Sequence, residues 1–470
     1  MRKIFLLIIF PVMCCAAKAQ VVHKKLEDAV KQLLGDEQLK HAIVGFYVIN
    51  SKTNEVVYEL NSSTGLAPAS TQKIFTSVAT LDILGKDYHY KTDLGYSGNI
   101  KNGLLNGNLL ITGYGDPSFG SWRFDHTKRD TILKQFVSAI QAAGIRHING
   151  DIILNDTKFS YQPLPGGYPW EDIGNYYGAG TWGINWNENQ YDLYLKPGTK
   201  EGDETEVIGT NPDLPVYDLN NQIKTGPGGS GDNAYIYTAP YSVSGFANGT
   251  VPAGEKKFTI SGSIPYPAEQ FGLELGDHLK NKGITISGEI VPGAKFTNDK
   301  KSIPAITQSL YTYYSPSLDS LIYWFLQKSI NLYGEAFAKT IAYEKTDFGS
   351  TDKGVDIIRT FWQQNGIEKN SVKMIDGSGL SPQNRVTATA EVAALQCAKT
   401  KPWFSSFYNA LPIFNGMKMK SGTIGGAKAF AGYQTASDGT EYTFSLIINN
   451  YDGGVDAVVQ KMYTLLDALK

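Results

Sequence analysis

A helix followed by a hairpin opens the chain, and a hairpin followed by a helix closes it. Apolar residues recur at helical spacing over 22–34, and two β-rich runs around a polar turn follow at 42–60. At the other end, the run 427–450 predicts a hairpin with Asp-Gly in its turn, and 455–469 predicts a helix. This arrangement predicts one sheet, assembled from both termini, in an α/β domain.

From about Tyr96 to Pro304, the middle of the chain has a different sequence pattern. Short β-rich runs alternate there with Gly, Pro and Asn, which indicates one or two β-rich domains inserted into the α/β domain. Helical spacing returns at 315–329 and 331–344. The length of 470 residues is typical of two to three domains.

The first residues have the composition of a secretory signal. Two basic residues precede an apolar run over 4–13, and a small-x-small cleavage sequence places the first mature residue at Gln20. The apolar run is too short for a membrane anchor. Cys14 and Cys15 leave a lipoprotein signal open as an alternative. We therefore expect residues 1–19 to be a signal peptide.

The rest of the chain has the composition of an exported, folded protein. Hydrophobic residues make up 42% of the sequence, enough for a substantial core. Cys397 is the only cysteine after the signal segment, so no internal disulfide is expected. No later segment is long and apolar enough to span a membrane. The formal net charge of −2 gives no electrostatic reason to expect binding to nucleic acid or to a membrane surface.

Ser70 and Lys73 stand three residues apart where a Gly/Pro-bearing loop meets an apolar helical pattern. Residues i and i+3 share one face of a helix, and a neutral lysine in reach of a serine hydroxyl can take its proton. The other Ser-x-x-Lys pair, Ser350 and Lys353, lies in a polar break. An alternative stays open at this point, in which Ser70 or Thr71 only caps the helix.

Serine acyl-transfer enzymes with a Ser-x-x-Lys pair also need a Ser-x-Asn turn. Ser97 and Asn99 form one such pair, in a Gly-rich turn that is typical of a structural role. Ser329 and Asn331 form the other, between two apolar helical runs. Asn331 could equally be a helix N-cap, so the second pair alone is not decisive.

The third motif of these enzymes is a Lys-Ser/Thr-Gly strand, and backbone chemistry chooses between two copies. The residue after the glycine should supply an N–H to the oxyanion hole. The triplet at Lys224 is followed by Pro227, which has no N–H, whereas the triplet at Lys420 is followed by Thr423. One ordered set therefore remains: Ser70 and Lys73, Ser329 and Asn331, and Lys420, Ser421 and Gly422.

With these motifs in order, the sequence resembles the low-molecular-mass class C penicillin-binding proteins, which are D-alanyl-D-alanine carboxypeptidase/endopeptidases of the bacterial periplasm. The resemblance covers nearly the whole mature chain and includes the strings Gly113–Phe119, Gly150–Phe159 and Asp376–Thr387. It implies a penicillin-binding-protein/β-lactamase-like α/β/α serine acyl-transferase domain with two inserted β-rich domains. The implied boundaries are 20–95 with 305–470 for the catalytic domain, 96–215 with 267–304 for inserted domain II, and 216–266 for inserted domain III.

The resemblance also implies a role for each motif residue. Ser70 would be the acylated nucleophile and Lys73 its general base. Ser329 and Asn331 would relay a proton and hold the substrate amide. The Lys420-Ser421-Gly422 strand would bind the terminal carboxylate of the substrate, with positive charge from Lys420 and a hydrogen bond from Ser421. The N–H groups of Ser70 and Thr423 would form the oxyanion hole.

Two further segments carry weaker expectations. Asp376 and Ser378 would border the cleft, although a tight glycine turn that only shapes the site explains the same string. Asp156 would contact the diamino acid of the stem peptide, although one acidic residue in a strand-to-loop turn is more often structural. Relatives often have a basic residue where this chain has Pro382, so an arginine contact at that point is not expected.

The predicted reaction is acyl transfer from the penultimate D-Ala of a peptidoglycan stem peptide, with β-lactams as acylating inhibitors in the periplasm. No metal or cofactor is expected, because the six histidines are scattered and form no His-Glu-x-x-His string. Nucleic acid and a transmembrane anchor are not expected either. Two alternatives remain, a β-lactamase and a non-catalytic peptidoglycan-binding protein. The sequence has no Glu-x-x-Leu-Asn string to position a deacylating water, so a β-lactamase of this sequence would be slow.

Overall fold

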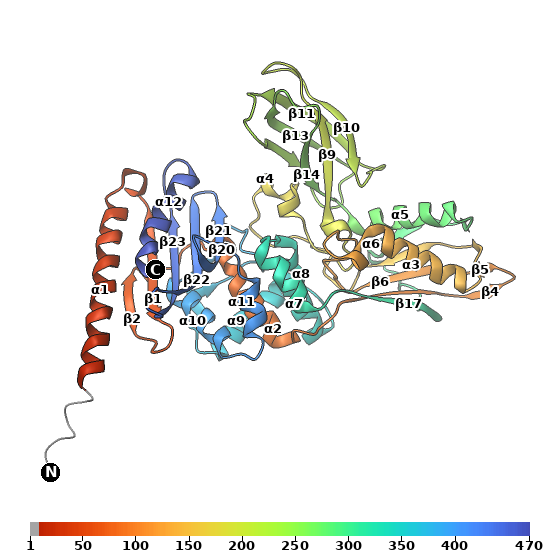
Figure 1. Cartoon of the computed structure of the whole chain (residues 1–470). Helices are drawn as coiled ribbons and strands as arrows, with labels where there is room; N and C mark the ends of the chain where they lie inside the picture. The colour runs from red at the N-terminus through yellow and green to blue at the C-terminus, as the bar shows by residue number, and fades with distance from the viewer. Residues whose placement is uncertain (1–8) are drawn as a thin grey trace, which may run out of the picture. The chain divides into compact units, whose positions relative to one another are not determined.

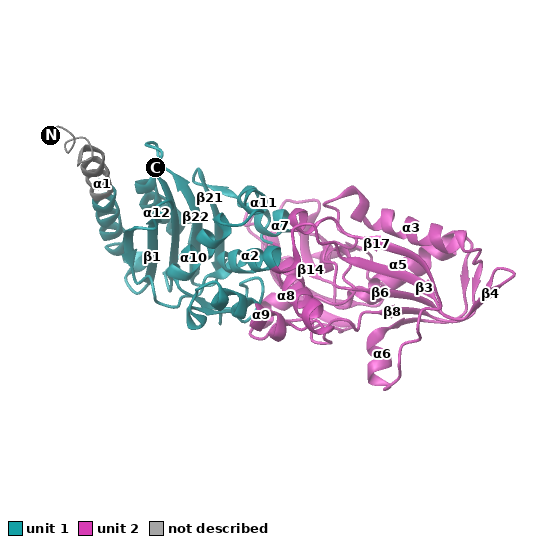
Figure 2. Cartoon of the chain, turned by 90° about the horizontal axis from the view of Figure 1, so that it is seen from below, with its two compact units in different colours: residues 1–82, 322–329, 358–470 teal, residues 83–321, 330–357 magenta. Residues whose placement is uncertain are grey.

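The computed structural model describes the chain from residue 9 and its side chains from residue 21 (Figure 1). Residues 1–8 of the expected signal peptide lie outside the described residues, and its remaining backbone begins helix α1 (Ile9–Leu34). The chain forms two compact units (Figure 2). Unit 1 comprises Met1–Asp82, Ile322–Ser329 and Ile358–Lys470, and unit 2 comprises Ile83–Leu321 and Ile330–Ile357.

Unit 1 is built on a six-stranded antiparallel sheet in the order β2-β1-β23-β22-β21-β20. Its strands are β1 (Ile43–Asn50), β2 (Val56–Leu60), β20 (Ile413–Phe414), β21 (Met417–Ile424), β22 (Ala427–Thr435) and β23 (Glu441–Asn449). The N-terminal strand β1 pairs with the C-terminal strand β23, with Val44 opposite Ile448 and Val48 opposite Phe444. The expected assembly of one sheet from both termini is therefore confirmed.

The two faces of this sheet differ in side-chain size. One face carries large apolar residues such as Phe46 and Phe444, which pack against Leu26 of α1 and Met462 of α12 (Val455–Leu466). Burying each such side chain contributes roughly 1.5–3 kcal/mol. The other face carries smaller residues such as Ser445, and helix α10 (Ala388–Lys399) lies against it. This second face leaves room for the polar groups of the site.

The other elements of unit 1 surround this sheet. They include the 3-10 helix η2 (Ala69–Gln72), α2 (Lys73–Leu84), α11 (Phe404–Ala410), β18 (Val372–Lys373) and β19 (Arg385–Val386). The chain passes from one unit to the other within helix α7 (Leu318–Gln327) and again within helix α9 (Thr351–Gln364).

Unit 2 contains a mixed five-stranded sheet and a four-stranded sheet around an aromatic core. The first has the order β16 (Ile290–Pro292), β8 (Ile152–Asn155), β6 (Leu109–Gly113), β3 (Lys91–Tyr96), β17 (Gln308–Tyr314). The second has the order β15 (Thr285–Ile286), β7 (His147–Ile148), β5 (Leu104–Asn106), β4 (Asn99–Lys101). Phe136 of α3 (Arg129–Ala142) and Phe271 of α5 (Pro267–Asn281) join Phe119 and Trp186 in the core.

Two three-stranded sheets in unit 2 share a separate small core that includes Leu193, Ile236 and Val251. Their strands are β9 (Gln190–Lys196), β10 (Glu206–Asn211), β11 (Asp218–Gly226), β12 (Asn233–Tyr237), β13 (Ser244–Pro252) and β14 (Phe258–Ser263). Other helices of unit 2 include α4 (Trp170–Ile173), η4 (Tyr176–Gly178), α6 (Gly293–Asn298) and α8 (Asn331–Thr346). The middle of the chain is thus β-rich, as expected, while its division into domains II and III stays a prediction.

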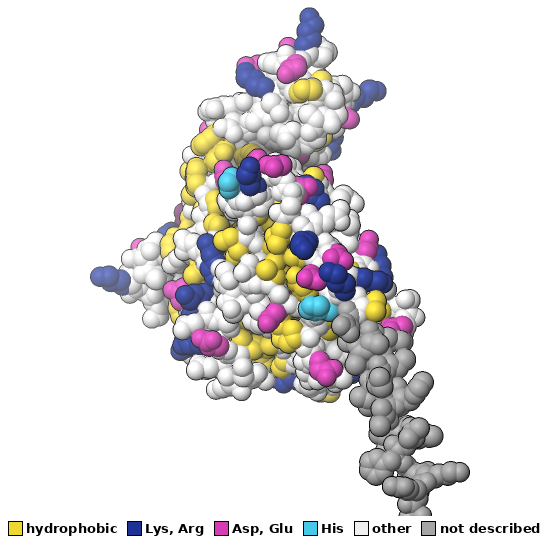
Figure 3. All heavy atoms as spheres, turned by 90° about the vertical axis from the view of Figure 1, so that its left-hand side faces the viewer, with side chains coloured by type: hydrophobic (Ala, Val, Ile, Leu, Met, Phe, Trp, Pro, Cys, Tyr) yellow, Lys and Arg dark blue, Asp and Glu magenta, His cyan; other side chains and the backbone are white. Residues whose placement is uncertain are grey.

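Charged side chains are mixed on the face that Figure 3 shows, with acidic and basic groups interspersed and no broad area of one sign. In the part of the chain that the structure describes, no helix has the length and apolar character needed to cross a membrane.

Candidate active site

Ser70 lies in η2, on a backbone that is strained immediately before it. Ala69 has a positive φ of 48°, a conformation that costs a non-glycine residue roughly 1–2 kcal/mol. The N-cap of η2 is Pro68, and the Thr71 hydroxyl donates to the Pro68 carbonyl oxygen at 2.8 Å. The Ser70 side chain is therefore not the cap of this helix and is available to a different partner.

That partner is Lys73, the first residue of α2. Its Nζ lies 3.0 Å from Ser70 Oγ and donates to the Ser378 carbonyl oxygen at 2.7 Å. The Lys73 side chain is fully buried, and Nζ lies 5.5 Å from the centre of the Phe325 ring. The three-residue spacing thus places a lysine within proton-transfer distance of a serine hydroxyl, in surroundings that exclude water.

Lys420 repeats this arrangement with a second serine. It lies on β21, and its Nζ donates to Ser329 Oγ at 3.0 Å and to the Ser421 carbonyl oxygen at 2.8 Å. Burial, and then the positive charges of Lys73 and Lys428, hold the pKa of Lys420 well below its usual range. Because buried ammonium groups repel each other, the pair Lys73 and Lys420 favours a state in which one of them is neutral.

Gly422 allows β21 to approach Ser70 closely. A Cβ atom at this position would overlap the Pro68 carbonyl oxygen and lie 2.8 Å from the backbone nitrogen of Ser70. Lys420 and Gly422 pair with Ala431 and Ala429, so their side chains share one face of the strand. Ser421 and Thr423 alternate onto the other face, where the Thr423 hydroxyl accepts a bond from Lys428 Nζ at 2.7 Å.

The outer edge of β21 is open next to this glycine. The short strand β20 pairs with β21 only at Met417 and Lys418. Within the described chain, no strand continues that pairing alongside Lys420, Ser421 and Gly422. An unpaired strand edge offers N–H and C=O groups to an extended peptide, which is how a substrate backbone is held by β-addition.

The Asp376–Ser378 loop contacts Lys73 through a backbone carbonyl group. The buried Asp376 carboxylate accepts bonds from the N–H groups of Gly379 and Ser381 at 2.7 and 2.6 Å. It also accepts from the amides of Gln72 and Asn384, at 2.8 and 3.0 Å. The Ser378 carbonyl oxygen holds Lys73, whereas the Ser378 hydroxyl accepts a bond from Leu380 N–H. These contacts connect Asp376 and Ser378 to the Ser70–Lys73 segment and to the rest of their own loop.

Asn331 and Asp156 belong to unit 2. Asn331 is the first residue of α8, whose N-cap is Ile330, so Asn331 is not the cap. Its amide donates to the Tyr177 carbonyl oxygen at 2.8 Å. Asp156 follows β8, is buried, and accepts a bond from the Tyr266 hydroxyl at 3.1 Å. Burial raises the pKa of the Asp156 carboxyl to about 6.

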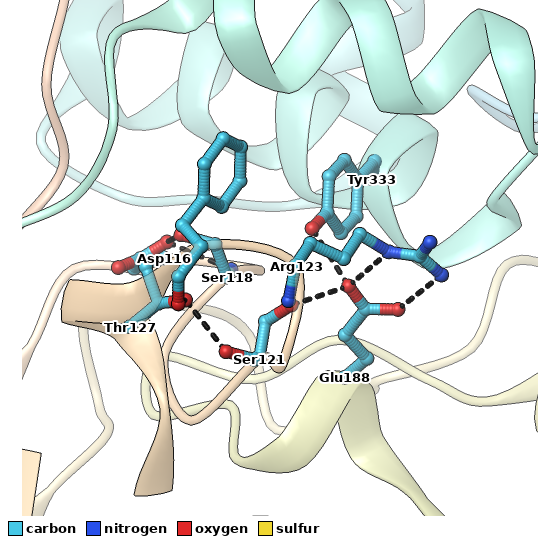
Figure 4. Close-up of polar contacts among 8 residues, drawn as sticks. Asp116, Ser118, Ser121, Arg123, Thr127, Glu188 and Tyr333 are labelled. Carbon is cyan, nitrogen blue, oxygen red and sulfur yellow. Dashed lines mark hydrogen bonds and ion pairs between the residues drawn. The ribbon is translucent and has the colours of Figure 1, made fainter. Parts of the chain in front are cut away.

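A buried polar network holds the start of α8 in unit 2 (Figure 4). The Tyr333 hydroxyl, two residues after Asn331, donates to Glu188 Oε1 at 2.8 Å. Arg123 binds both oxygens of the same carboxylate, at 2.7 and 3.0 Å, and Ser121 Oγ donates to it at 2.8 Å. Paired and hydrogen-bonded buried charges of this kind fix one geometry because breaking them leaves an unpaired charge.

Glu391 is a residue of the site that the sequence analysis did not identify. This buried glutamate of α10 accepts bonds from the Thr71 hydroxyl at 2.5 Å and the Ser445 hydroxyl at 2.6 Å. It therefore ties the residue after Ser70 to the central sheet. The only sequence signal was a lone acidic residue in an alanine-rich helical run, and such a residue is usually solvent-exposed.

The pKa of Glu391 makes this tie sensitive to pH. Burial raises the pKa of the carboxyl from 4.5 to about 7. A carboxyl with a raised folded-state pKa stabilises the fold while it is protonated, and this contribution is lost as the pH rises through about 7. Between about pH 5 and about pH 8, we expect the free energy of unfolding of the wild type to fall by roughly 3 kcal/mol more than that of Glu391→Gln. Denaturant unfolding at a series of pH values measures this difference, and parallel curves would contradict it.

No group of three or more His, Cys, Asp or Glu side chains among the described residues could hold a metal ion. The site consists instead of two serines, two buried lysines and an open strand edge within unit 1. This is the arrangement of a serine acyl-transfer centre.

Comparison with known proteins gives the family. A model of the D-Ala-D-Ala carboxypeptidase 3 (S13) family matches residues 26–468. The chain belongs to this family. The expected enzyme class, a serine-type D-Ala-D-Ala carboxypeptidase, is thereby confirmed.

Relatives of this S13 chain span most of its length. It is 26% identical over 474 residues to a D-alanyl-D-alanine carboxypeptidase of Actinomadura sp. (strain R39), covering 93% of this chain and 83% of that protein. It is 24% identical over 445 residues to the D-alanyl-D-alanine carboxypeptidase DacB of Haemophilus influenzae, covering 87% of this chain and 86% of that protein. The crystal structure of penicillin binding protein 4 (dacB) from Haemophilus influenzae matches with a TM-score of 0.79 at 21% identity, over 94% and 99% of the two chains. The expected fold class is confirmed by this match.

Proposed function

We propose that this S13 enzyme cleaves the terminal D-Ala-D-Ala bond of peptidoglycan stem peptides through an acyl-enzyme at Ser70, and that penicillin acylates the same residue. The observation that carries the proposal is the pairing of Ser70 with Lys73 and of Ser329 with Lys420, with the two lysines close enough for the charge of one to lower the pKa of the other. A pair of this kind can accept one proton and deliver another.

Acylation would follow from these contacts. Lys73 and Lys420 share one positive charge, and in the state in which Lys73 is the neutral partner it takes the proton of Ser70 Oγ while the oxygen attacks the carbonyl carbon of the penultimate D-Ala. The negative charge that develops on the carbonyl oxygen would be stabilised by the N–H groups of Ser70 and Thr423. This proposal is supported by the close approach of Gly422, the residue before Thr423, to the backbone nitrogen of Ser70. The C–N bond then breaks, and the departing amine of D-Ala receives a proton through Ser329 and Lys420.

Deacylation restores the enzyme. Water attacks the Ser70 ester, one proton returns to Ser70 Oγ, and the shortened stem peptide leaves as a carboxylate. If the departing amine belongs to a cross-linked neighbouring stem, the same steps give endopeptidase cleavage. Lys420 and Ser421 would bind the terminal carboxylate, and Asn331 would hold the substrate amide. We place the enzyme in the periplasm, after removal of residues 1–19, because its polymeric substrate lies there.

The test is mass spectrometry of pentapeptide monomers and cross-linked dimers incubated with the mature protein. Loss of D-Ala from monomers, or conversion of dimers to monomers, supports the proposal and shows which bond is preferred. Binding of the fragments without a change in mass would contradict it and favour a non-catalytic binding protein. Rapid hydrolysis of penicillin with no action on peptides would favour a β-lactamase.

Asp156 provides a prediction about the stem peptide, since we propose that its carboxylate contacts the side-chain amine of the diamino acid. For peptides with a free amine, we expect Asp156→Asn to lower kcat/KM by roughly tenfold, the size of one charge-assisted hydrogen bond. The wild-type preference for the free amine should disappear as the pH falls through about 6, because the carboxyl becomes neutral. The control is the same peptide with its amine acetylated. An equal loss on both peptides would assign Asp156 a structural role.

A further inference from the structure

One face of the sheet β11-β13-β12 in unit 2 is rich in aromatic and amide side chains. The register aligns residues in rows across the three strands, because residues opposite each other point to the same side. The central rows carry the following residues, which we call the aromatic face: Gln222, Asn248 and Tyr235 in one row, and Asn220, Phe246 and Tyr237 in the next. The alternate residues, among them Ile223, Ala247 and Ile236, form the small core on the other side.

The rings of the aromatic face form a cluster that we call the platform. The Tyr237 and Phe246 rings are stacked, with centroids 4.7 Å apart and planes at 9°. Trp170 of α4 extends the platform, with its ring centroid 6.0 Å from that of Tyr237 and its plane tilted by 44°. The Tyr235 side chain projects on the same side of β12 as Tyr237 and is 42% exposed, and Trp170 is 49% exposed. Large aromatic groups gathered in solvent typically mark an interaction site.

The segment that flanks this platform also contacts Asn331. The Asn175 side chain accepts a bond from Ile236 N–H at 3.1 Å, which fixes the segment along the edge of β12. Two residues later, the Tyr177 carbonyl oxygen accepts the Asn331 amide at 2.8 Å. Within unit 2, the aromatic face is therefore joined through one short segment to a residue of the proposed catalytic set.

The chemistry of the aromatic face selects among possible ligands. Its side chains are rings, amides and hydroxyls; on β11 the charged residues Asp218 and Lys224 lie beyond its two ends, and Lys224 is paired with Glu204. A nucleic acid would need unpaired basic groups to neutralise its phosphates. A sugar polymer needs ring faces for its C–H surfaces, and amides or hydroxyls for its hydroxyl and acetamido groups. The neutral composition of the aromatic face fits a sugar polymer.

The geometry points to the aromatic face as a binding site for the glycan strand of peptidoglycan, a polymer of N-acetylated amino sugars. This inference rests on the proposed function, since the stem peptides that Ser70 would cleave are attached to this strand. The two exposed rings, Tyr235 and Trp170, would stack on sugar rings of the strand, while Gln222 and Asn248 bond to the sugar substituents. The site would retain the enzyme on its polymeric substrate.

The experiment measures binding of the full mature chain to purified glycan strands from which the stem peptides have been removed with an amidase. We expect Tyr235→Ala and Trp170→Ala each to raise the dissociation constant roughly tenfold, as for an aromatic residue central to an interface. Tyr235→Phe, which keeps the ring, should bind nearly as well as the wild type. The matched control is Tyr314→Ala, which removes a tyrosine of strand β17 that is 58% exposed. Thermal unfolding of each variant checks that it is folded.

Each outcome bears on the inference separately from the proposed function. No binding of glycan by the wild type, or equal binding by Tyr235→Ala and Tyr314→Ala, would overturn the inference. Acylation by penicillin is measured on the same samples. A protein that is acylated but does not bind glycan contradicts only the glycan site, and one that binds glycan but is not acylated contradicts only the proposed function.

Discussion

Replacing Ser70 with alanine is expected to abolish both acylation by penicillin and release of D-Ala. The variant removes the oxygen that would carry the acyl group, while Lys73 keeps its bond to the Ser378 carbonyl oxygen. Removing a catalytic serine typically lowers kcat by about 10³-fold or more, since only substrate binding and the oxyanion hole remain. Intact-protein mass spectrometry after incubation with benzylpenicillin should show an adduct on the wild type and none on Ser70→Ala.

The matched control for this variant is Ser350→Ala. Ser350 belongs to the other Ser-x-x-Lys pair of the sequence, where Lys353 forms an exposed ion pair with Asp356. We expect this variant to be acylated at the wild-type rate. An adduct of the same mass on Ser70→Ala, or its loss in Ser350→Ala, would show that Ser70 is not the residue that carries the acyl group.

The sheet and the motif contacts of unit 1 could be anticipated from the sequence because each depends on a short, regular pattern. The alternating runs at both termini predicted the pairing of β1 with β23, since each run needs a partner for its backbone groups. The spacing of Ser70 and Lys73 predicted one helix face, and their side chains are 3.0 Å apart. The order of the motifs led to Lys420 and Ser329, which lie in contact although 91 positions separate them.

Contacts without a repeating pattern could not be anticipated. Glu391 binds Thr71 across 320 positions, and Tyr333 binds Glu188 across 145. Buried carboxylates are exceptions to the rule that charged residues are exposed, so composition argues against them until their partners are seen. The unit boundaries could not be anticipated either. Ser329 and Asn331 form one sequence motif, yet the chain passes from unit 1 to unit 2 between them.

The substitution Gly422→Ala should nearly abolish activity, although it adds only one methyl group. That methyl would overlap the Pro68 carbonyl oxygen and lie within 2.9 Å of the backbone nitrogens of Ser70 and Thr71. Either β21 or the segment 68–71 must move, and the separation of the Ser70 and Thr423 N–H groups would change with it. Misplacement of reacting groups by about 1 Å can cost about 10²-fold in rate. We therefore expect the rate of acylation by penicillin to fall by about 10²-fold or more.

Gly425→Ala is the matched control, because it makes the same chemical change three residues away. A Cβ atom at position 425 meets no heavy atom within 4 Å, and Gly425 does not have a positive φ. Stopped-flow acylation with a chromogenic β-lactam compares the two variants directly, and thermal unfolding shows whether each is folded. If Gly422→Ala reacts as fast as Gly425→Ala, the close approach of β21 to Ser70 is not required, and the oxyanion hole must be formed by groups other than the Thr423 N–H.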